Sequence, residues 1–324
     1  MNNQIPNMSD LNNNRQIKPR PFYIFAPLVI NYCVSIVVQL IFTIVLFIGV
    51  FTNYAQESVE FQELLVMAET ETEISSMEEI EAMMSTELTT ELTNQLLEAV
   101  TDHIALLTIL CAVATIPVFL YLMKKDKAYF QLLGVPKRSR VSYGRYPILV
   151  VGSIALCIAL NNILTLSQLA EISVGYQEAS DSLYSISFQM QILGLCIITP
   201  IAEELVFRGV IYNRIKLYFK PMNAMLVSAM IFGLYHGNLV QMIYGGTCGF
   251  VLVWMYEKFG SLKAPILAHI CLNLTSVVLT QYEAFVWMFS DQIRMTVVTV
   301  LSATLAALIY VMIENMERKN LETI

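Results

Sequence analysis

The chain has 324 residues, of which 56% are hydrophobic and 14% are charged, and its formal net charge is -7 at pH 7. Its mean hydropathy of +0.60 is too high for a water-soluble domain of this length. The sequence contains neither a glycine-rich phosphate-binding loop nor a nucleic-acid-binding motif, so no nucleic-acid partner is expected. The composition predicts a polytopic membrane protein whose main solvent is the lipid bilayer.

Eight apolar segments are long enough to cross a bilayer, since a transmembrane helix needs roughly 20 mostly apolar residues. We therefore expect an all-α fold of about eight transmembrane helices. Residues 1–21 are rich in Asn and poor in apolar residues, which predicts a disordered cytoplasmic tail. The eight predicted helices span residues 22–51, 103–123, 146–168, 184–206, 222–240, 241–257, 264–282 and 295–313.

Basic residues divide unequally between the two sides of the predicted helices. Eighteen of the nineteen Lys and Arg residues lie on the side that carries both termini, and only Arg294 lies on the other. Because basic residues accumulate in cytoplasmic loops, both termini are expected in the cytoplasm. The chain is thus predicted to be a multi-pass protein of the plasma membrane.

The segment between the first two predicted helices, residues 52–102, is strongly acidic. It contains thirteen Asp and Glu residues and no Lys or Arg, which predicts an extracytoplasmic insertion within an N-terminal helix pair, residues 22–123. Apolar residues from Phe61 to Met84 recur at helical spacing, which indicates one or two amphipathic helices outside the membrane. A solvated insertion is the simpler interpretation, and a cap that filters substrates is the alternative.

Ionisable side chains within membrane helices indicate function, because desolvating a charge is costly unless a partner or water is supplied. The stretch IITPIAEELVFRGVIY, residues 197–212, carries Glu203, Glu204 and Arg208. Glu204 and Arg208 are four residues apart and so share a helical face, which would let the arginine neutralise that carboxylate. Glu203 is turned about 100° away by the helical period, so it can face a different partner.

Two of the three histidines also lie within predicted membrane helices. His269 and Asn273 are four residues apart and share a face, and Phe232 and His236 repeat this interval, which would place the ring between the histidine and lipid. A free glutamate, a histidine, and a second histidine paired with an asparagine can activate water and hold a tetrahedral intermediate, with or without a metal. The pattern predicts hydrolysis.

The two histidines differ in their distance along the chain from the cytoplasmic side. At about 1.5 Å per residue, His269 lies roughly 9 Å past Lys263, whereas His236 lies roughly 24 Å past Lys220. They can meet only if the segment after Lys220 begins outside the membrane or if the helix of His269 begins deep within it.

Three short motifs in these segments resemble those of a known family. EELVFR matches the pattern EExxxR, FGLYH matches FxxxH, and HICLN matches HxxxN, in the order found in the CPBP family of intramembrane proteases. That family includes the type II CAAX prenyl endopeptidases and proteins of bacteriocin processing and self-immunity. The resemblance covers roughly residues 140–285, which would form the protease core, and residues 286–324 would form a final helix and cytoplasmic tail.

The resemblance implies an active site inside the helix bundle, in a cleft that opens toward the cytoplasmic leaflet. Glu203 would be the general base that activates water, assisted by His236. His269 and Asn273 would stabilise the oxyanion of the intermediate.

Three further residues would support this site. Glu204 and Arg208 would complete and brace it, and Phe232 belongs to the second motif. A zinc ion could be held by Glu204, His236 and His269, although the histidines come from different helices and no HExxH pair exists. The zinc and the metal-free alternatives both stay open.

The predicted function is a bacterial intramembrane endopeptidase that hydrolyses membrane-tethered, lipidated or amphipathic peptides near the cytoplasmic face. Bacteriocin precursors and signalling-peptide leaders are further substrate classes that the resemblance implies. An ion-coupled transporter, in which Glu203 and the histidines relay protons, is one alternative, and a non-catalytic scaffold or bacteriocin-immunity protein is another. Charge-neutral substitution of Glu203 would separate them, because only a protease would lose peptide cleavage.

Overall fold

The computed structural model describes residues 21–59, 61–63, 66, 86–135 and 138–316, and its regular elements are all helices. The predicted all-α polytopic fold is confirmed. The predicted N-terminal tail, except for Pro21, and the last residues of the C-terminal tail lie outside the described residues. In the described part of the chain, seven helical segments are long and apolar enough to cross a membrane: Phe22–Glu57, Ile104–Leu132, Tyr143–Leu166, Phe188–Ile215, Leu239–Phe259, Lys263–Gln281 and Gln292–Glu314.

The fifth predicted span, residues 222–240, is shorter than expected. α13 (Pro221–Tyr235) has 15 residues, about 22 Å of helix against a hydrocarbon core of about 30 Å. The chain turns because Gly237 adopts a φ of +80°, and the side chain of Asn238 then accepts the backbone N–H of Gln241 to cap α14 (Leu239–Phe259). His236 therefore lies at the end of a helix.

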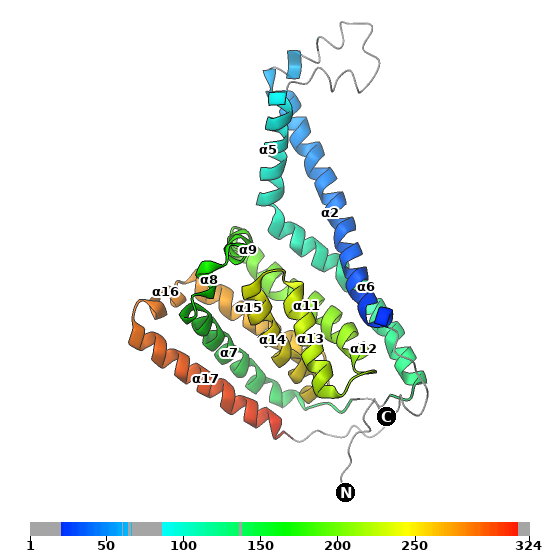
Figure 1. Ribbon diagram of the computed structural model, residues 1–324, viewed down its shortest axis with the longest axis vertical. Helices are drawn as coiled ribbons and strands as arrows, with labels where there is room; N and C mark the ends of the chain where they lie inside the picture. Colours follow the sequence, from blue (N-terminus) through cyan, green and yellow to red (C-terminus); the bar gives the residue numbers. More distant parts are fainter. Residues whose placement is uncertain (1–20, 60, 64–65, 67–85, 136–137, 317–324) are drawn as a thin grey trace.

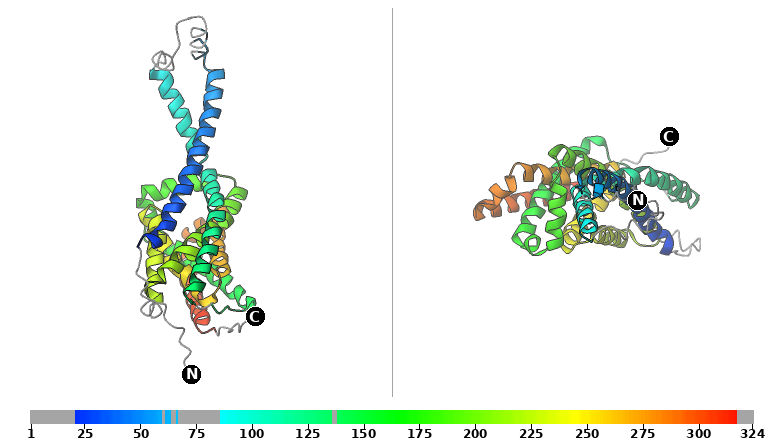
Figure 2. Two further views of the ribbon diagram at one scale, coloured as in Figure 1. Left: turned by 90° about the vertical axis from the view of Figure 1, so that its right-hand side faces the viewer. Right: turned by 90° about the horizontal axis from the view of Figure 1, so that it is seen from above.

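α2 (Pro21–Glu57) and α5 (Thr86–Asp102) form an arm that projects from the helix bundle (Figures 1 and 2). α2 has 37 residues, about 55 Å of helix, so it is much longer than a bilayer crossing requires. α5 packs against α2, and α6 (Ile104–Leu132) follows it back along the bundle (Figure 1). The described residues of the predicted acidic insertion, 52–59, 61–63, 66 and 86–102, lie at the outer part of this arm.

A small apolar cluster lies near the end of the arm. Phe61 packs against Tyr54, and the partly buried Leu92 of α5 covers the pair. Of the other apolar residues between Phe61 and Met84, Val66 is described, and the rest lie outside the described residues.

A buried ion pair joins the N-terminal helices to the bundle. Asp126 of α6 accepts from Nε of Arg214, in α12 (Asn213–Ile215), at 2.7 Å and from its Nη2 at 3.0 Å. The Tyr23 hydroxyl of α2 donates to the same carboxylate at 3.0 Å, and the Tyr23 ring centroid lies 4.2 Å from the guanidinium carbon. Asp126 and Arg214 are both buried, so three helices share one charged contact.

The bundle surrounds a long, broken helical segment. α7 (Tyr146–Leu166) packs between α15 (Lys263–Gln281) and α17 (Gln292–Glu314), and α13 pairs with α14 as a hairpin (Figure 1). The hairpin is tight because Gly233 has no side chain: a Cβ there would lie 2.5 Å from the Met242 carbonyl oxygen. The shorter elements are η1 (Tyr143–Arg145), α8 (Leu169–Ile172), α9 (Val174–Tyr184), α10 (Phe188–Met190) and α16 (Ala284–Phe289).

Two π-helical stretches, η2 (Gln191–Ile198) and η3 (Leu205–Tyr212), flank the short α11 (Thr199–Glu204). π-Helices are rare and are concentrated at functional sites. Pro200 gives a physical reason for the first stretch, since its ring disfavours a tight turn and it has no N–H. The preceding Thr199 N–H bonds to the Gly194 carbonyl five residues back, as the wider π-helical turn requires.

Candidate active site

A buried ion pair lies at the junction of α11 and η3. Nη1 of Arg208 donates to Oε1 of Glu204 at 2.6 Å, and Nη2 donates to the Gly249 carbonyl at 3.0 Å. Glu204 and Arg208 are 0% and 1% exposed. Such a pair is held in place because losing either partner would leave an uncompensated charge in the interior.

His269 of α15 lies between the two neighbouring carboxylates. Its Nδ1 is 3.0 Å from Oε1 of Glu204, and its Nε2 is 3.6 Å from Oε2 of Glu203. The ionised Glu204 oxygen, already paired with Arg208, can only accept a hydrogen bond, so Nδ1 must be the donor. This contact fixes the orientation of the ring and directs Nε2 toward Glu203.

The two glutamates have different surroundings. The side chain of Glu203 is 18% exposed, whereas that of Glu204 is fully buried. Glu204 is neutralised by Arg208, and the Glu203 carboxylate faces an imidazole edge instead of a cation on the same helix. The carboxylate that can be reached from outside the packed interior is therefore that of Glu203.

His236 follows directly after α13. Its Nδ1 lies 2.8 Å from the Phe232 carbonyl oxygen, an acceptor left free near the helix end. Because a carbonyl cannot donate, Nδ1 carries the proton and, in the neutral ring, Nε2 is the acceptor. The preceding helix thus selects the tautomer in which Nε2 can bind a water hydrogen.

Phe232 connects the histidines to the ion pair. Its ring centroid lies 4.9 Å from that of His236 and 6.0 Å from that of His269, both edge-on. The guanidinium carbon of Arg208 lies 4.4 Å from the same centroid. The phenylalanine of the second motif therefore packs at the centre of the site, where it excludes water from the buried charges.

Glycines of α14 make room for these side chains. A Cβ on Gly249 would lie 2.8 Å from Cδ1 of Phe232, and a Cβ on Gly245 would lie 3.3 Å from Nδ1 of His236. The glycine cluster therefore packs α13 against α14 within one chain.

Asn273 does not pair with His269 in this structure. Its Nδ2 donates to the Leu195 carbonyl oxygen in η2 at 2.9 Å. In the π-helical ladder, this carbonyl would accept the N–H of residue 200, five positions on, and Pro200 has none. Asn273 thus supplies the donor that the proline removes, and it ties α15 to the helix that carries both glutamates.

The zinc alternative was tested against the same geometry. Among the described residues, no group of three or more His, Cys, Asp and Glu side chains is arranged to hold a metal ion. Within the suggested ligand set, Oε1 of Glu204 already binds Arg208, and Nδ1 of His269 binds that same oxygen. In the described part of the chain, Glu204, His236 and His269 therefore do not fit a zinc site.

Sequence patterns missed three residues that border the site. Tyr235 lies edge-on to His236, with ring centroids 6.2 Å apart, and it contacts Asn31 of α2. Asn31 in turn contacts Thr115 of α6. Asn31 and Thr115 are polar residues within apolar membrane helices, and this was the signal in the sequence. Other polar residues occur in the same helices, so the sequence did not show which of them contact the site.

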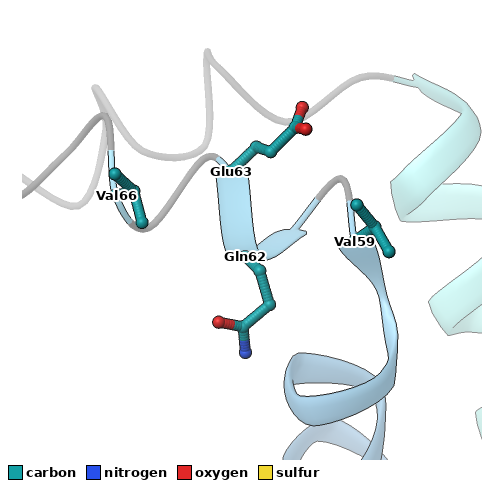
Figure 3. Close-up of a pocket in the computed structure, with 4 residues that line it drawn as sticks. All are labelled: Val59, Gln62, Glu63 and Val66. Carbon is teal, nitrogen blue, oxygen red and sulfur yellow. The ribbon is translucent and has the colours of Figure 1, made fainter.

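A shallow hollow at the end of the arm is separate from this site. It is lined by Val59, Gln62, Glu63 and Val66, which follow α2 (Figure 3). The site residues lie on α11, η3, α13 and α15 and at His236, directly after α13, within the bundle (Figure 1). None of them lines the hollow.

One comparison with known proteins concerns the segment that carries the site. Residues 185–275 match the sequence model of a family described as "Type II CAAX prenyl endopeptidase Rce1-like". The chain is also 33% identical over 98 residues to a protein of Bacillus subtilis (strain 168) named "Putative membrane peptidase YdiL". That match covers 29% of this chain and 38% of the relative. No solved structure matches the chain.

Proposed function

Because residues 185–275 match the model of the Rce1-like type II CAAX prenyl endopeptidase family, we propose that this chain is an intramembrane endopeptidase. Its substrates are membrane-associated peptides, lipidated or amphipathic, and it cleaves them near the cytoplasmic face of a bacterial plasma membrane. The description of the matched family supports the prenylated class in particular. The matched segment contains both glutamates, both histidines and Asn273.

Glu203 is the general base. Its carboxylate takes a proton from a water molecule, and the water oxygen forms a bond to the peptide carbonyl carbon. When the intermediate collapses, the carbon–nitrogen bond breaks and the same proton goes to the leaving amine. Nε2 of His236 accepts the second hydrogen of the water and orients it, a role favoured by the Nδ1 contact to Phe232.

The oxyanion of the intermediate is stabilised by side chains of α15. Asn273 has two amide hydrogens, of which one binds the Leu195 carbonyl, so the other can donate to the oxyanion. When Nε2 of His269 carries a proton, it can donate a hydrogen bond to the oxyanion from the side of the ring that faces Glu203. Glu204 holds the imidazole for this purpose through Nδ1.

The position of His269 between two unlike carboxylates carries this proposal. A purely structural ion pair would need only Glu204 and Arg208, which already neutralise each other at 2.6 Å. The additional partly exposed carboxylate of Glu203, 3.6 Å from the far edge of the ring, has no evident packing function. An acid–base pair oriented by a buried carboxylate is the arrangement that general base catalysis requires.

The test is hydrolysis of an internally quenched, farnesylated peptide ending in a CAAX sequence by the purified full chain in detergent. Glu203→Gln keeps the size of the side chain and removes the base, so the rate should fall by about a thousandfold or more. Glu178→Gln, an exposed glutamate on α9, is the matched control and should cleave like the wild type.

Three outcomes separate the candidate functions. Cleavage by the wild type and by Glu178→Gln, but not by Glu203→Gln, supports the endopeptidase. Equal cleavage by all three proteins would remove Glu203 from the mechanism. Proton-coupled flux in liposomes that depends on Glu203, without cleavage, would instead support the transporter alternative.

A further inference from the structure

Tyr235, the last residue of α13, borders the candidate active site. Its ring lies edge-on to Phe207 at 5.3 Å and to His236 at 6.2 Å between centroids. Phe207 in turn packs edge-on against Phe232 at the centre of the site, with ring centroids 4.9 Å apart. The side chain is 48% exposed, so it is not sealed into the packing as Phe232 is.

The hydroxyl of Tyr235 is held by a residue from outside the matched segment. Nδ2 of Asn31, in α2, donates to the Tyr235 hydroxyl oxygen at 3.0 Å. In this contact the phenol accepts a hydrogen bond, so its own O–H hydrogen is left to donate elsewhere. Asn31 thereby fixes the position of the oxygen without using its proton.

Asn31 is itself held by a third helix. Oγ1 of Thr115, in α6, donates to Oδ1 of Asn31 at 3.1 Å. Asn31 and Thr115 are 4% and 3% exposed. Buried polar groups in an apolar environment are costly when they are unsatisfied, so this relay from Thr115 to Asn31 to Tyr235 is the arrangement that satisfies them.

We propose that Tyr235 is a further substrate-contacting residue of this site, whose hydroxyl donates a hydrogen bond to the reacting peptide beside Glu203. Asn31 and Thr115 are positioning residues that act through Tyr235. The inference rests on the proposed endopeptidase function for its chemistry, and on the hydrogen bonds from Thr115 to Asn31 and from Asn31 to Tyr235 for its geometry. It gives the N-terminal helices α2 and α6, which lie outside the matched segment, a part in assembling the site.

The kinetic test uses the farnesylated CAAX peptide and the full chain in detergent. Tyr235→Phe removes only the hydroxyl and should lower kcat about tenfold to a hundredfold, with KM changed less than about twofold, as for a donor used mainly in the transition state. Tyr282→Phe, which alters a 72% exposed tyrosine, should leave both constants unchanged. A Tyr235→Phe protein with wild-type kcat would overturn the proposal.

The positioning role predicts that the effects do not add. Asn31→Leu should lower kcat about threefold to tenfold, and the double variant Asn31→Leu/Tyr235→Phe should be no slower than Tyr235→Phe alone. Thr115→Val, which is nearly the same size as the wild type, repeats the test if Asn31→Leu does not fold. If the double variant instead loses kcat by the product of the two single effects, Asn31 does not act through Tyr235. That result would overturn its assignment as a positioning residue.

A second measurement does not depend on cleavage. With 3-fluorotyrosine at position 235, the ¹⁹F resonance of the detergent-solubilised protein should shift on Asn31→Leu and on Glu203→Gln, but not on Glu178→Gln. If neither of the first two variants shifts the resonance, Tyr235 is not held beside Glu203 and the inference fails. If the resonance shifts but the wild type cleaves no peptide, the proposed function fails while the placement of Tyr235 stands.

Discussion

The first membrane helix and the helix that carries the glutamates are both apolar, yet they have different neighbours. In the most apolar stretch of α2 no residue is buried in the protein, whereas half of the corresponding stretch of Phe188–Ile215 is buried. In water, an apolar stretch of this kind would mark the core. In a bilayer the lipid solvates it, so the buried positions are marked by polar side chains that need protein partners.

The N-terminal helices follow the same rule where they touch the bundle. α2 is exposed along most of its length, and its contacts with other helices include the polar residues Tyr23 and Asn31. The matched segment, by contrast, has a continuous network from Arg208 through Glu204 to His269. Four substitutions test this contrast, from the centre of that network to the lipid-exposed surface.

Breaking the buried ion pair of the bundle should have the largest effect. Arg208→Met leaves the fully buried Glu204 carboxylate without its cation, so the free energy of unfolding should fall by about 3–5 kcal/mol. The free energy of unfolding is measured by titrating the protein in mixed micelles with SDS and monitoring the loss of helix by circular dichroism.

A compensating variant checks the cause of that loss. Glu204→Gln/Arg208→Met removes both charges and should recover most of the lost stability. If the double variant is no more stable than Arg208→Met, the loss reflects packing instead of the unpaired charge.

Weakening the ion pair between α6 and the bundle should have the next largest effect. Asp126→Asn removes the charge that Arg214 pairs with, but the arginine keeps its hydrogen bond to the Tyr23 carbonyl. The expected loss is about 2–3 kcal/mol in the same unfolding assay. Asp181→Asn, at an exposed position of α9, is the control, and equal effects of the two substitutions would contradict the buried role of Asp126.

A smaller effect should separate the two roles of Asn273. Asn273→Leu should cost about 1–2 kcal/mol of stability because it leaves the Leu195 carbonyl without a donor. In a Pro200→Ala background, which restores a backbone N–H, the same change should cost less than about 0.5 kcal/mol. Equal costs in both backgrounds would mean that Asn273 does not replace the proline's missing donor.

The smallest effect is expected on the lipid-exposed face of α2. Leu40 is 60% exposed, and Leu40→Ala should change the free energy of unfolding by less than about 0.5 kcal/mol. Leu252 of α14 is fully buried, and Leu252→Ala should cost about 2 kcal/mol or more. Similar costs at the two positions would show that α2 packs against protein along this face.

The sequence predicted the features that depend on residues close together in the chain. The all-α polytopic fold followed from the lengths of the apolar segments, and the contact between Glu204 and Arg208 followed from their four-residue spacing. Glu203 was expected to face a different partner from Glu204, but the two carboxylates contact opposite ring nitrogens of the same residue, His269. Gly237 and Asn238 are residue types typical of a helix end and of a helix start. The predicted helix over residues 222–240 nevertheless continued through both of them.

The sequence could not show contacts that depend on helix irregularity and on tertiary packing. A regular period of 3.6 residues paired His269 with Asn273, but the structure engages His269 with Glu204 and Asn273 with Leu195. The count of residues from the cytoplasmic side suggested different depths for the two histidines. Both rings nevertheless pack edge-on against Phe232, a tertiary contact that counting residues along the chain does not reveal.

The length of α2 also bears on how its acidic end can act. Its 37 residues make about 55 Å of helix, about 25 Å more than the hydrocarbon thickness. At physiological ionic strength the Debye length is about 8 Å, so Glu57 and Glu63 at the end of the arm are separated from Glu203 by several screening lengths. The negative charge of the arm is therefore electrostatically isolated from the chemistry, and neutralising it should leave the pH profile of hydrolysis unchanged.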